Sequence, residues 1–196
     1  MLVTLSGGAG AGKTTLAAAL AADAPDGPVR VLHGDDYYVR TPERGVWTHD
    51  GTGTPRLDVG DPRSMDGERL SRDTDTALAA AAHVIVDGMF AHHTAPRTQT
   101  ARFDVFVDLP ADLRLARKIA RKCLRDGFPL EVLLRNYLDH RRDAHARHVE
   151  PLRHSCDLIV DATLAPDVLA RTVWQAVANR AFAGEAIVNK TCPHGD

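Results

Sequence analysis

A glycine-rich segment near the start of the chain constrains the fold more than any other feature. Residues 7–14, "GGAGAGKT", place four residues between Gly7 and the Gly12-Lys13-Thr14 triplet, which fits a phosphate-binding loop. Residues 1–6 are a short apolar run rich in β-forming side chains, and residues 14–24 have strong helix propensity. Strand, glycine loop and helix in this order are the context in which such a loop holds phosphate, so a chance glycine turn is the weaker alternative.

The loop predicts a nucleotide site with defined roles. Glycines let the backbone N–H groups turn inward around phosphate oxygens, and the start of the helix favours an anion. Lys13 is expected to reach the β- and γ-phosphates, and the Thr14 hydroxyl to bind Mg²⁺. The predicted nucleotide-binding residues are Gly7, Gly8, Ala9, Gly10, Ala11, Gly12, Lys13, Thr14 and Thr15.

Composition and charge argue against several classes of protein. The 196 residues are 44% hydrophobic and 26% charged with a net charge of −2, whereas a nucleic-acid-binding domain is usually strongly basic. No apolar run approaches the ~20 residues that span a bilayer, and the loop begins too close to Met1 for a cleavable leader. Three widely spaced cysteines predict reduced thiols. We therefore expect a cytoplasmic protein with neither nucleic acid nor membrane as partner.

Strand and helix patterns alternate along the rest of the chain. Apolar, β-branched runs at residues 29–34, 83–88, 104–109 and 157–162 predict four more buried strands. Helical patterns lie between and after them, at residues 64–82, 111–126, 130–148 and 166–182. This alternation predicts a parallel sheet with helices on both faces. We expect one domain over residues 1–183, with a lid at about 112–130, and a weakly patterned tail over 184–196.

Acidic residues follow two of the predicted strands. Asp35 and Asp36 come after the second strand, and Asp87 ends the third. A lone aspartate in such a place is usually a helix cap or part of a turn. Ligands of open α/β sheets, however, bind beyond the carboxyl ends of the strands, where the phosphate loop also lies. The convergence predicts phosphoryl transfer, with one carboxylate accepting the proton of a hydroxyl and another attending Mg²⁺.

Residues 111–126 form a strongly amphipathic helical pattern. Arg117, Arg121 and Arg125 repeat at i, i+4 and i+8 and so form one stripe. Such a stripe is most often a solvated face, but the glycine and proline of "RDGFP" just after it could hinge a lid over phosphates. The opposite, apolar face is expected to pack on the protein and comprises Leu113, Ala116, Ile119, Ala120, Cys123 and Leu124.

These motifs together resemble the uridine kinase family and its relatives, nicotinamide riboside kinase and phosphoribulokinase. The similar segments, in the family's order, are the loop, "GDDYY" (34–38), "DPRSMD" (61–66), "VDGMF" (86–90), "RLARKIARKCLRDG" (114–127) and "HVEPLRHSCDLIVD" (148–161). The resemblance implies an α/β fold, the three-layer α/β/α P-loop NTPase fold, with a five-stranded parallel sheet ordered 2-3-1-4-5 and a helical lid.

The resemblance also implies an activity and roles for residues. Asp35 would be the general base, Thr14 and Asp87 would attend Mg²⁺, and Arg117 and Arg121 would act from the lid together with Lys13 of the loop. The implied reaction is ATP-dependent phosphorylation of a hydroxyl on a nucleoside-like or sugar-like metabolite. Whether ATP or GTP is the donor stays open, and many family members are homo-oligomers.

Departures from the family pattern concern the acceptor. The helix over 64–82 leads straight into the strand at His83, leaving little room for the β-hairpin that uridine kinases carry before their third strand. Gly60 stands where the ribose-binding aspartate is expected, with Asp58 or Asp61 as substitutes. We therefore expect a changed pocket and poor use of uridine and cytidine. The candidate acceptor residues are Asp36, Tyr37, Tyr38, Asp58, Asp61, His92, His93 and Arg97, each of which could instead be a packing or exposed residue.

Two alternatives to a metabolic kinase remain. A specialised kinase of natural-product biosynthesis or antibiotic inactivation would suit a changed acceptor pocket. A nucleotide-switch protein would use the same loop without transfer, but the guanine-reading N-K-x-D motif of such proteins is missing from the sequence.

Overall fold

A parallel sheet of five strands forms the centre of the molecule. The computed structural model describes residues 1–50 and 53–190. The sheet order is β2-β5-β1-β6-β7, and every neighbouring pair is parallel. The strands are β1 (Leu2–Ser6), β2 (Val29–His33), β5 (His83–Asp87), β6 (Arg102–Asp108) and β7 (Leu158–Asp161). Among these five strands, numbered along the chain, the order is 2-3-1-4-5, as the resemblance implies.

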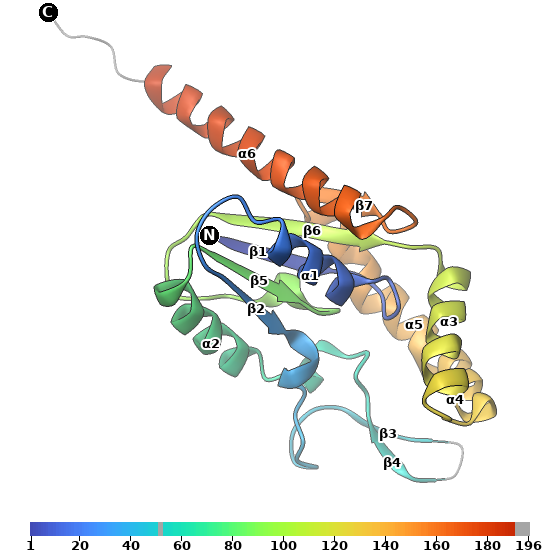
Figure 1. Cartoon of the computed structure of the whole chain (residues 1–196). Helices are drawn as coiled ribbons and strands as arrows, with labels where there is room; N and C mark the ends of the chain where they lie inside the picture. The colour runs from blue at the N-terminus through green and yellow to red at the C-terminus, as the bar shows by residue number, and fades with distance from the viewer. Residues whose placement is uncertain (51–52, 191–196) are drawn as a thin grey trace, which may run out of the picture.

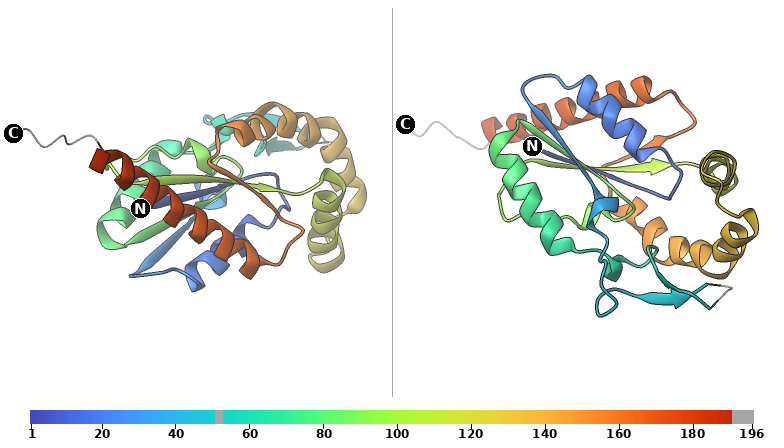
Figure 2. Two further views of the ribbon diagram at one scale, coloured as in Figure 1. Left: turned by 90° about the horizontal axis from the view of Figure 1, so that it is seen from above. Right: turned by 60° about the horizontal axis from the view of Figure 1, so that its bottom comes forward.

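Helices cover both faces of this sheet, which gives three layers (Figures 1 and 2). Helices α1 (Lys13–Ala22) and α6 (Pro166–Lys190) pack on one face, over Val3 and Leu5 of β1. Helix α2 (Gly67–Ala80) packs on the opposite face, over Leu2. Because β1 is buried on both faces, all five of its residues are buried, which explains its continuous apolar pattern. The predicted fold class is confirmed.

Capping residues decide where the helix before β5 begins. The Asp66 carboxylate accepts a hydrogen bond from the Arg69 backbone N–H at 3.0 Å, so α2 starts at Gly67 and not at residue 64. Residues Pro62–Ser64 form a separate 3₁₀ turn, capped by the Asp61 carboxylate. At the other end of the chain, α6 continues to Lys190; residues 184–190 of the predicted tail therefore extend this helix, and residues 191–196 lie outside the described residues.

A β-hairpin lies between β2 and α2, contrary to the sequence prediction. Strands β3 (Trp47–His49) and β4 (Pro55–Leu57) pair antiparallel, with Trp47 opposite Leu57. The prediction was wrong because the hairpin precedes α2, whereas only the space between that helix and β5 was considered. Figure 1 shows the hairpin projecting below the sheet, near the helices of the predicted lid. The missing hairpin was one of the two reasons to expect poor phosphorylation of uridine, and that reason no longer holds.

The predicted lid lies beyond the carboxyl end of β6 (Figure 1). Helix α3 (Ala111–Ile119) continues as a π-helical segment to Arg125, and α4 (Leu130–Asn136) begins a second helical run that passes through α5 (Arg142–Ala144) to Val149. The expected apolar packing face is buried only in part: Ile119 and Cys123 are half-buried, but Leu124 is 81% and Leu113 is 41% exposed. Arg114 and Lys118, on the predicted polar face, are half-buried as well. This helix lies beyond the carboxyl edge of the sheet and not on its face, so basic residues share its half-buried side with apolar ones.

Among the described residues, no helix is both long enough and apolar enough to cross a membrane. Cys123 and Cys156 are free thiols, and Cys192 lies outside the described residues.

Candidate active site

A cavity of about 920 Å³ opens at the carboxyl edge of the sheet. The phosphate loop lines it from Ala9 to Thr15, whereas Gly7 and Gly8 do not line it. The other predicted residues along its wall are Asp35, Asp36, Tyr38, Asp87, Arg117 and Arg121. The structure thus brings the predicted phosphate, carboxylate and lid groups together in one space.

Glycine at the start of the loop is required by its backbone. Gly7 has φ +146°, and a Cβ placed there would lie 2.4 Å from the Val107 carbonyl oxygen of β6. Any side chain would push the loop away from the sheet edge. The first residue of the motif therefore sets how closely the loop follows β6.

Lys13 is a buried cation at the floor of the cavity. The residue is 9% exposed, and its Nζ donates a hydrogen bond to the Gly8 carbonyl oxygen at 3.0 Å. Burial lowers the pKa of Lys13 to about 8, against the opposing effect of the Asp35 and Asp87 carboxylates. An ammonium has three donors, so N–H groups remain to bind phosphate oxygens. The loop and its lysine fit a triphosphate.

Asp87 is hydrogen-bonded to Thr14, and the sequence predicts that both residues bind Mg²⁺. Its buried carboxylate accepts from the Thr14 hydroxyl at 2.6 Å, and its second oxygen lies 2.6 Å from His33 Nδ1. Hydroxyl and carboxylate oxygens beside the phosphate loop are donors that Mg²⁺ prefers, so these residues fit the ion. No cluster of three or more His, Cys, Asp or Glu side chains suited to a metal occurs among the described residues, and Mg²⁺ usually takes its other ligands from water and phosphate.

His33 was missed by the sequence prediction, although a signal for it exists. It ends β2 directly opposite Asp87 in the parallel pairing of β2 with β5. The implied strand order already puts β2 beside β5, so the residues that end these two strands, His33 and Asp87, were candidates for contact. Its ring orients the Asp87 carboxylate toward Thr14.

Asp35 and Asp36 follow β2 in a single 3₁₀ turn, Gly34–Tyr37. Neither side chain caps this turn, which disfavours the capping alternative. Both residues are exposed and line the cavity, and the negative charge of Asp35 raises the pKa of Lys13 against the effect of burial. The Asp36 backbone carbonyl instead accepts from Arg69 of α2. Asp35 thus has an electrostatic link to the lysine of the phosphate loop.

Arg117 joins the lid to the loop. Its guanidinium donates to the Ala162 carbonyl oxygen at 3.2 Å and lies 3.5 Å from the Ala11 carbonyl oxygen. Arg121 lies one turn further along, at the rim of the same cavity, and its charge acts on Lys13. The arginine stripe of the sequence therefore faces the predicted phosphate region over these two residues.

Most of the predicted acceptor residues do not line the main cavity. Tyr37 is 6% exposed and its hydroxyl donates to Asp73 of α2 at 2.9 Å; burial raises its pKa to about 12, so the hydroxyl remains a donor. Asp61 caps the 3₁₀ turn and pairs with Arg63. Asp58 pairs with Arg141 of the second helical run. The structure therefore places these three side chains outside the main cavity, in contacts with other protein groups.

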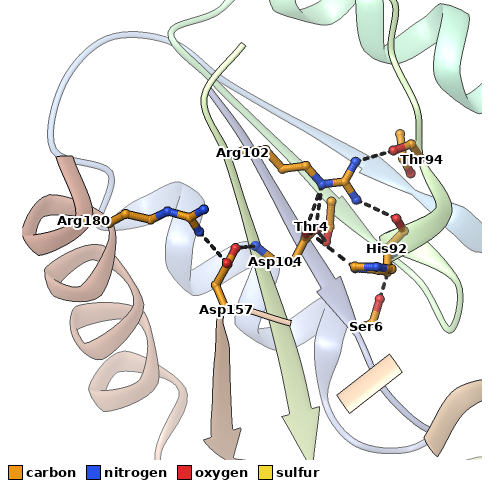
Figure 3. A network of polar contacts seen from close by, with 8 residues as sticks. All are labelled: Thr4, Ser6, His92, Thr94, Arg102, Asp104, Asp157 and Arg180. Carbon is orange, nitrogen blue, oxygen red and sulfur yellow. Dashed lines mark hydrogen bonds and ion pairs between the residues drawn. The ribbon is translucent and has the colours of Figure 1, made fainter. Parts of the chain in front are cut away.

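His92, His93 and Arg97 lie away from the main cavity as well. Figure 3 shows His92 in a buried polar network around Asp104, whose carboxylate accepts from Thr4 at 2.5 Å and from Arg102 at 2.9 Å. The Arg102 guanidinium also donates to the His92 carbonyl oxygen. His93 and Arg97 line a separate pocket against α2. Loop position alone gave no sign of this network, which fastens the segment after β5 to the sheet.

A second cavity, of about 270 Å³, adjoins the first on the side of α3 and α5. The two share Ala9, Val59, Met89 and Lys118. Further residues that line the second cavity are Gly60, Ala111, Arg114, Leu115, Tyr137, Arg141, Arg142, His145, Ala146, Val149 and Glu150. A Cβ on Gly60 would lie 2.7 Å from that of Ala144, so no aspartate fits there. The second cavity is thus lined by α3, which belongs to the predicted lid, and by the second helical run, which follows that lid in the sequence.

Replacing Gly7 with alanine tests the loop geometry. We expect Gly7→Ala to lower the free energy of unfolding by ~1–3 kcal/mol and to weaken ATP binding, because the new Cβ meets backbone at a positive φ. Gly67→Ala is the matched control: it begins α2 with nothing within 4 Å of its Cβ, and should be neutral or slightly stabilising. Urea denaturation measures both, and equal stabilities would contradict the loop geometry.

Comparison with known proteins identifies relatives of this chain. Residues 61–168 match the model of the family described as "Phosphoribulokinase / Uridine kinase family". A uridine kinase of Chlamydia pneumoniae is 24% identical over 91% of this chain and 89% of its own length. A uridine kinase of Deinococcus deserti is 27% identical over 81% of this chain and 86% of its own length.

Solved structures share the fold. A shikimate kinase from Acinetobacter baumannii superposes with a TM-score of 0.56 at 20% identity, covering 91% of this chain and 93% of its own. A sugar kinase from Janibacter sp. HTCC2649 gives a TM-score of 0.56 at 18% identity, covering 90% of this chain and 94% of its own.

Proposed function

Because the chain belongs to the phosphoribulokinase/uridine kinase family, we propose that it transfers the γ-phosphoryl group of ATP to a hydroxyl of a small nucleoside-like or sugar-like metabolite. Both enzymes in the family's name are kinases, which confirms the resemblance and the predicted small-molecule kinase. The observation that carries the reaction is the convergence of Lys13, Asp35 and the Thr14–Asp87 pair on one cavity.

Each residue has a task that its position supports. The loop amides and Lys13 bind the triphosphate, and Arg117 and Arg121 add positive charge over it. Asp35 accepts the proton of the acceptor hydroxyl as the new O–P bond forms and the bond to the β–γ bridging oxygen breaks. Thr14 and Asp87 would hold Mg²⁺, which neutralises the phosphate charge when bound. Tyr38 donates its hydroxyl to the Val59 carbonyl oxygen at 2.9 Å and fixes the wall between the two cavities.

The charge of Lys13 predicts how ATP binding depends on pH. Because the pKa of Lys13 is about 8, Lys13 of the free enzyme is an ammonium below that pH. Above it, Lys13 must take up a proton for ATP to bind. The dissociation constant of ATP should therefore rise above about pH 8, by up to ~tenfold per pH unit. Calorimetry in buffers of different ionisation enthalpy measures both affinity and proton uptake. Lys13→Ala should show neither change, and a flat wild-type profile would contradict the role of Lys13.

Acceptor dependence separates this kinase from a nucleotide switch. Formation of ADP should increase on adding a hydroxylated compound from a panel of nucleosides, sugars and hydroxylated antibiotics. The last group tests the specialised-kinase alternative. Slow ATP hydrolysis that no compound stimulates would favour the switch and contradict the proposal.

A further inference from the structure

Lys118 is a cation without a partner where the two cavities meet. It lines both, is half-buried, and forms no hydrogen bond or ion pair with any residue that the structure describes. Burial lowers its pKa, and repulsion from Arg141, Arg121 and Lys122 lowers it further. A charge held in this way is unfavourable unless an anion binds to it.

The carboxylates around the second cavity already have cationic partners. Asp58 pairs with Arg141, and Glu150 accepts from Arg153 at 2.8 Å. Arg114, on the same side of α3 as Lys118, donates its Nε–H to the Leu109 carbonyl oxygen at 2.9 Å, which carries no net charge. Glu150 and Asp108 also act on the charge of Arg114, so the uncompensated positive charge on the α3 side of the cavity is that of Lys118.

The remaining walls of the second cavity suit a compact organic molecule. Met89, Leu115, Tyr137 and Val149 supply apolar and aromatic surface, and the volume of about 270 Å³ adjoins the cavity that contains Asp35. A small ligand can thus span both spaces, with a hydroxyl toward Asp35 and another group toward Lys118.

We propose that the acceptor carries an anionic oxygen group, a carboxylate or a phosphate, in addition to the hydroxyl that is phosphorylated, and that Lys118 binds this group in the second cavity. The inference rests on the proposed function and narrows its substrate class. A neutral nucleoside leaves the Lys118 charge unpaired, whereas a hydroxy acid or a sugar phosphate pairs with it.

Matched pairs of compounds test this inference. D-Gluconate is compared with D-gluconamide, D-glycerate with D-glyceramide, and ribose 5-phosphate with ribose, so that the first two pairs report on a carboxylate and the third on a phosphate. In at least one pair, wild type should show a higher kcat/KM for the anion. Lys118→Gln should lower kcat/KM for that anion by about 10- to 100-fold, mainly by raising its KM. The kcat/KM for the neutral compound of the pair and the KM for ATP should change little.

Two further variants control this comparison. Arg125→Gln removes an exposed cation that pairs with Asp126 on the same helical run and should leave kinetics unchanged. Lys118→Arg should retain the preference for the anion, and unfolding curves verify that Lys118→Gln is folded.

Several results would overturn the inference. One is that wild type prefers the anion in none of the pairs. Another is that Lys118→Gln raises the KM for ATP as much as the KM for the acceptor, which would mean that Lys118 binds the phosphoryl donor. Phosphorylation of neutral compounds alone would remove this inference but leave the proposed kinase intact. ATP hydrolysis without any phosphorylated product would remove both.

Discussion

Lys13→Ala is expected to lower kcat/KM for ATP by on the order of 10³-fold while the protein remains folded. Lys13 is the buried cation of the phosphate loop, and its only described hydrogen bond is to the Gly8 carbonyl oxygen. Removing it therefore takes away charge at the developing phosphoryl group and little packing. Acceptor-dependent ADP formation measures the loss, and an unfolding curve verifies the fold.

Lys122→Ala is the matched control for this variant, because it also removes a lysine but from an exposed ion pair with Asp126. Its turnover should equal that of wild type. Unimpaired turnover by Lys13→Ala would contradict the nucleotide site itself.

Asp35→Asn is expected to lower kcat by about 10²–10⁴-fold and to leave the affinity for ATP little changed. The amide keeps the shape of the side chain but cannot accept the proton of the acceptor hydroxyl. Single-turnover kinetics with saturating ATP isolates this step from nucleotide binding.

The neighbouring carboxylate provides the control for Asp35. Asp36→Asn should remain active, because Asp36 lines the same cavity while Asp35 is the residue whose charge acts on Lys13. If Asp36→Asn is the inactive variant and Asp35→Asn is active, the base has been assigned to the wrong residue.

Most residues of the main cavity could be predicted, because the sequence patterns that indicate them are local or follow from the order of the strands. Residues 7–14 fix the loop by their own backbone requirements, and Asp35 and Asp87 follow strands whose ends meet at one edge. The pairing of Asp87 with His33 needed one further step, since it depends on which strand lies beside β5.

The acceptor region was much less predictable. The strands β3 and β4 are short and carry no clear alternation of apolar and polar residues, so the hairpin was missed. Amphipathicity placed the apolar side of α3 inward, but this helix lies beside a cavity and directs Arg114 and Lys118 toward it. His92 was assigned to the ligand from its position in a loop, whereas a distant partner, Asp104 of β6, holds that loop on the sheet.

Direct identification of the reaction products tests the central claim, that this chain is a kinase acting on a hydroxyl. Wild type, ATP, Mg²⁺ and the acceptor panel are incubated together, and the products are analysed by mass spectrometry and phosphorus NMR. We expect one phosphorylated acceptor for each ADP formed, and the loss of both products in Lys13→Ala. ADP accompanied only by inorganic phosphate, whichever compound is present, would contradict the claim.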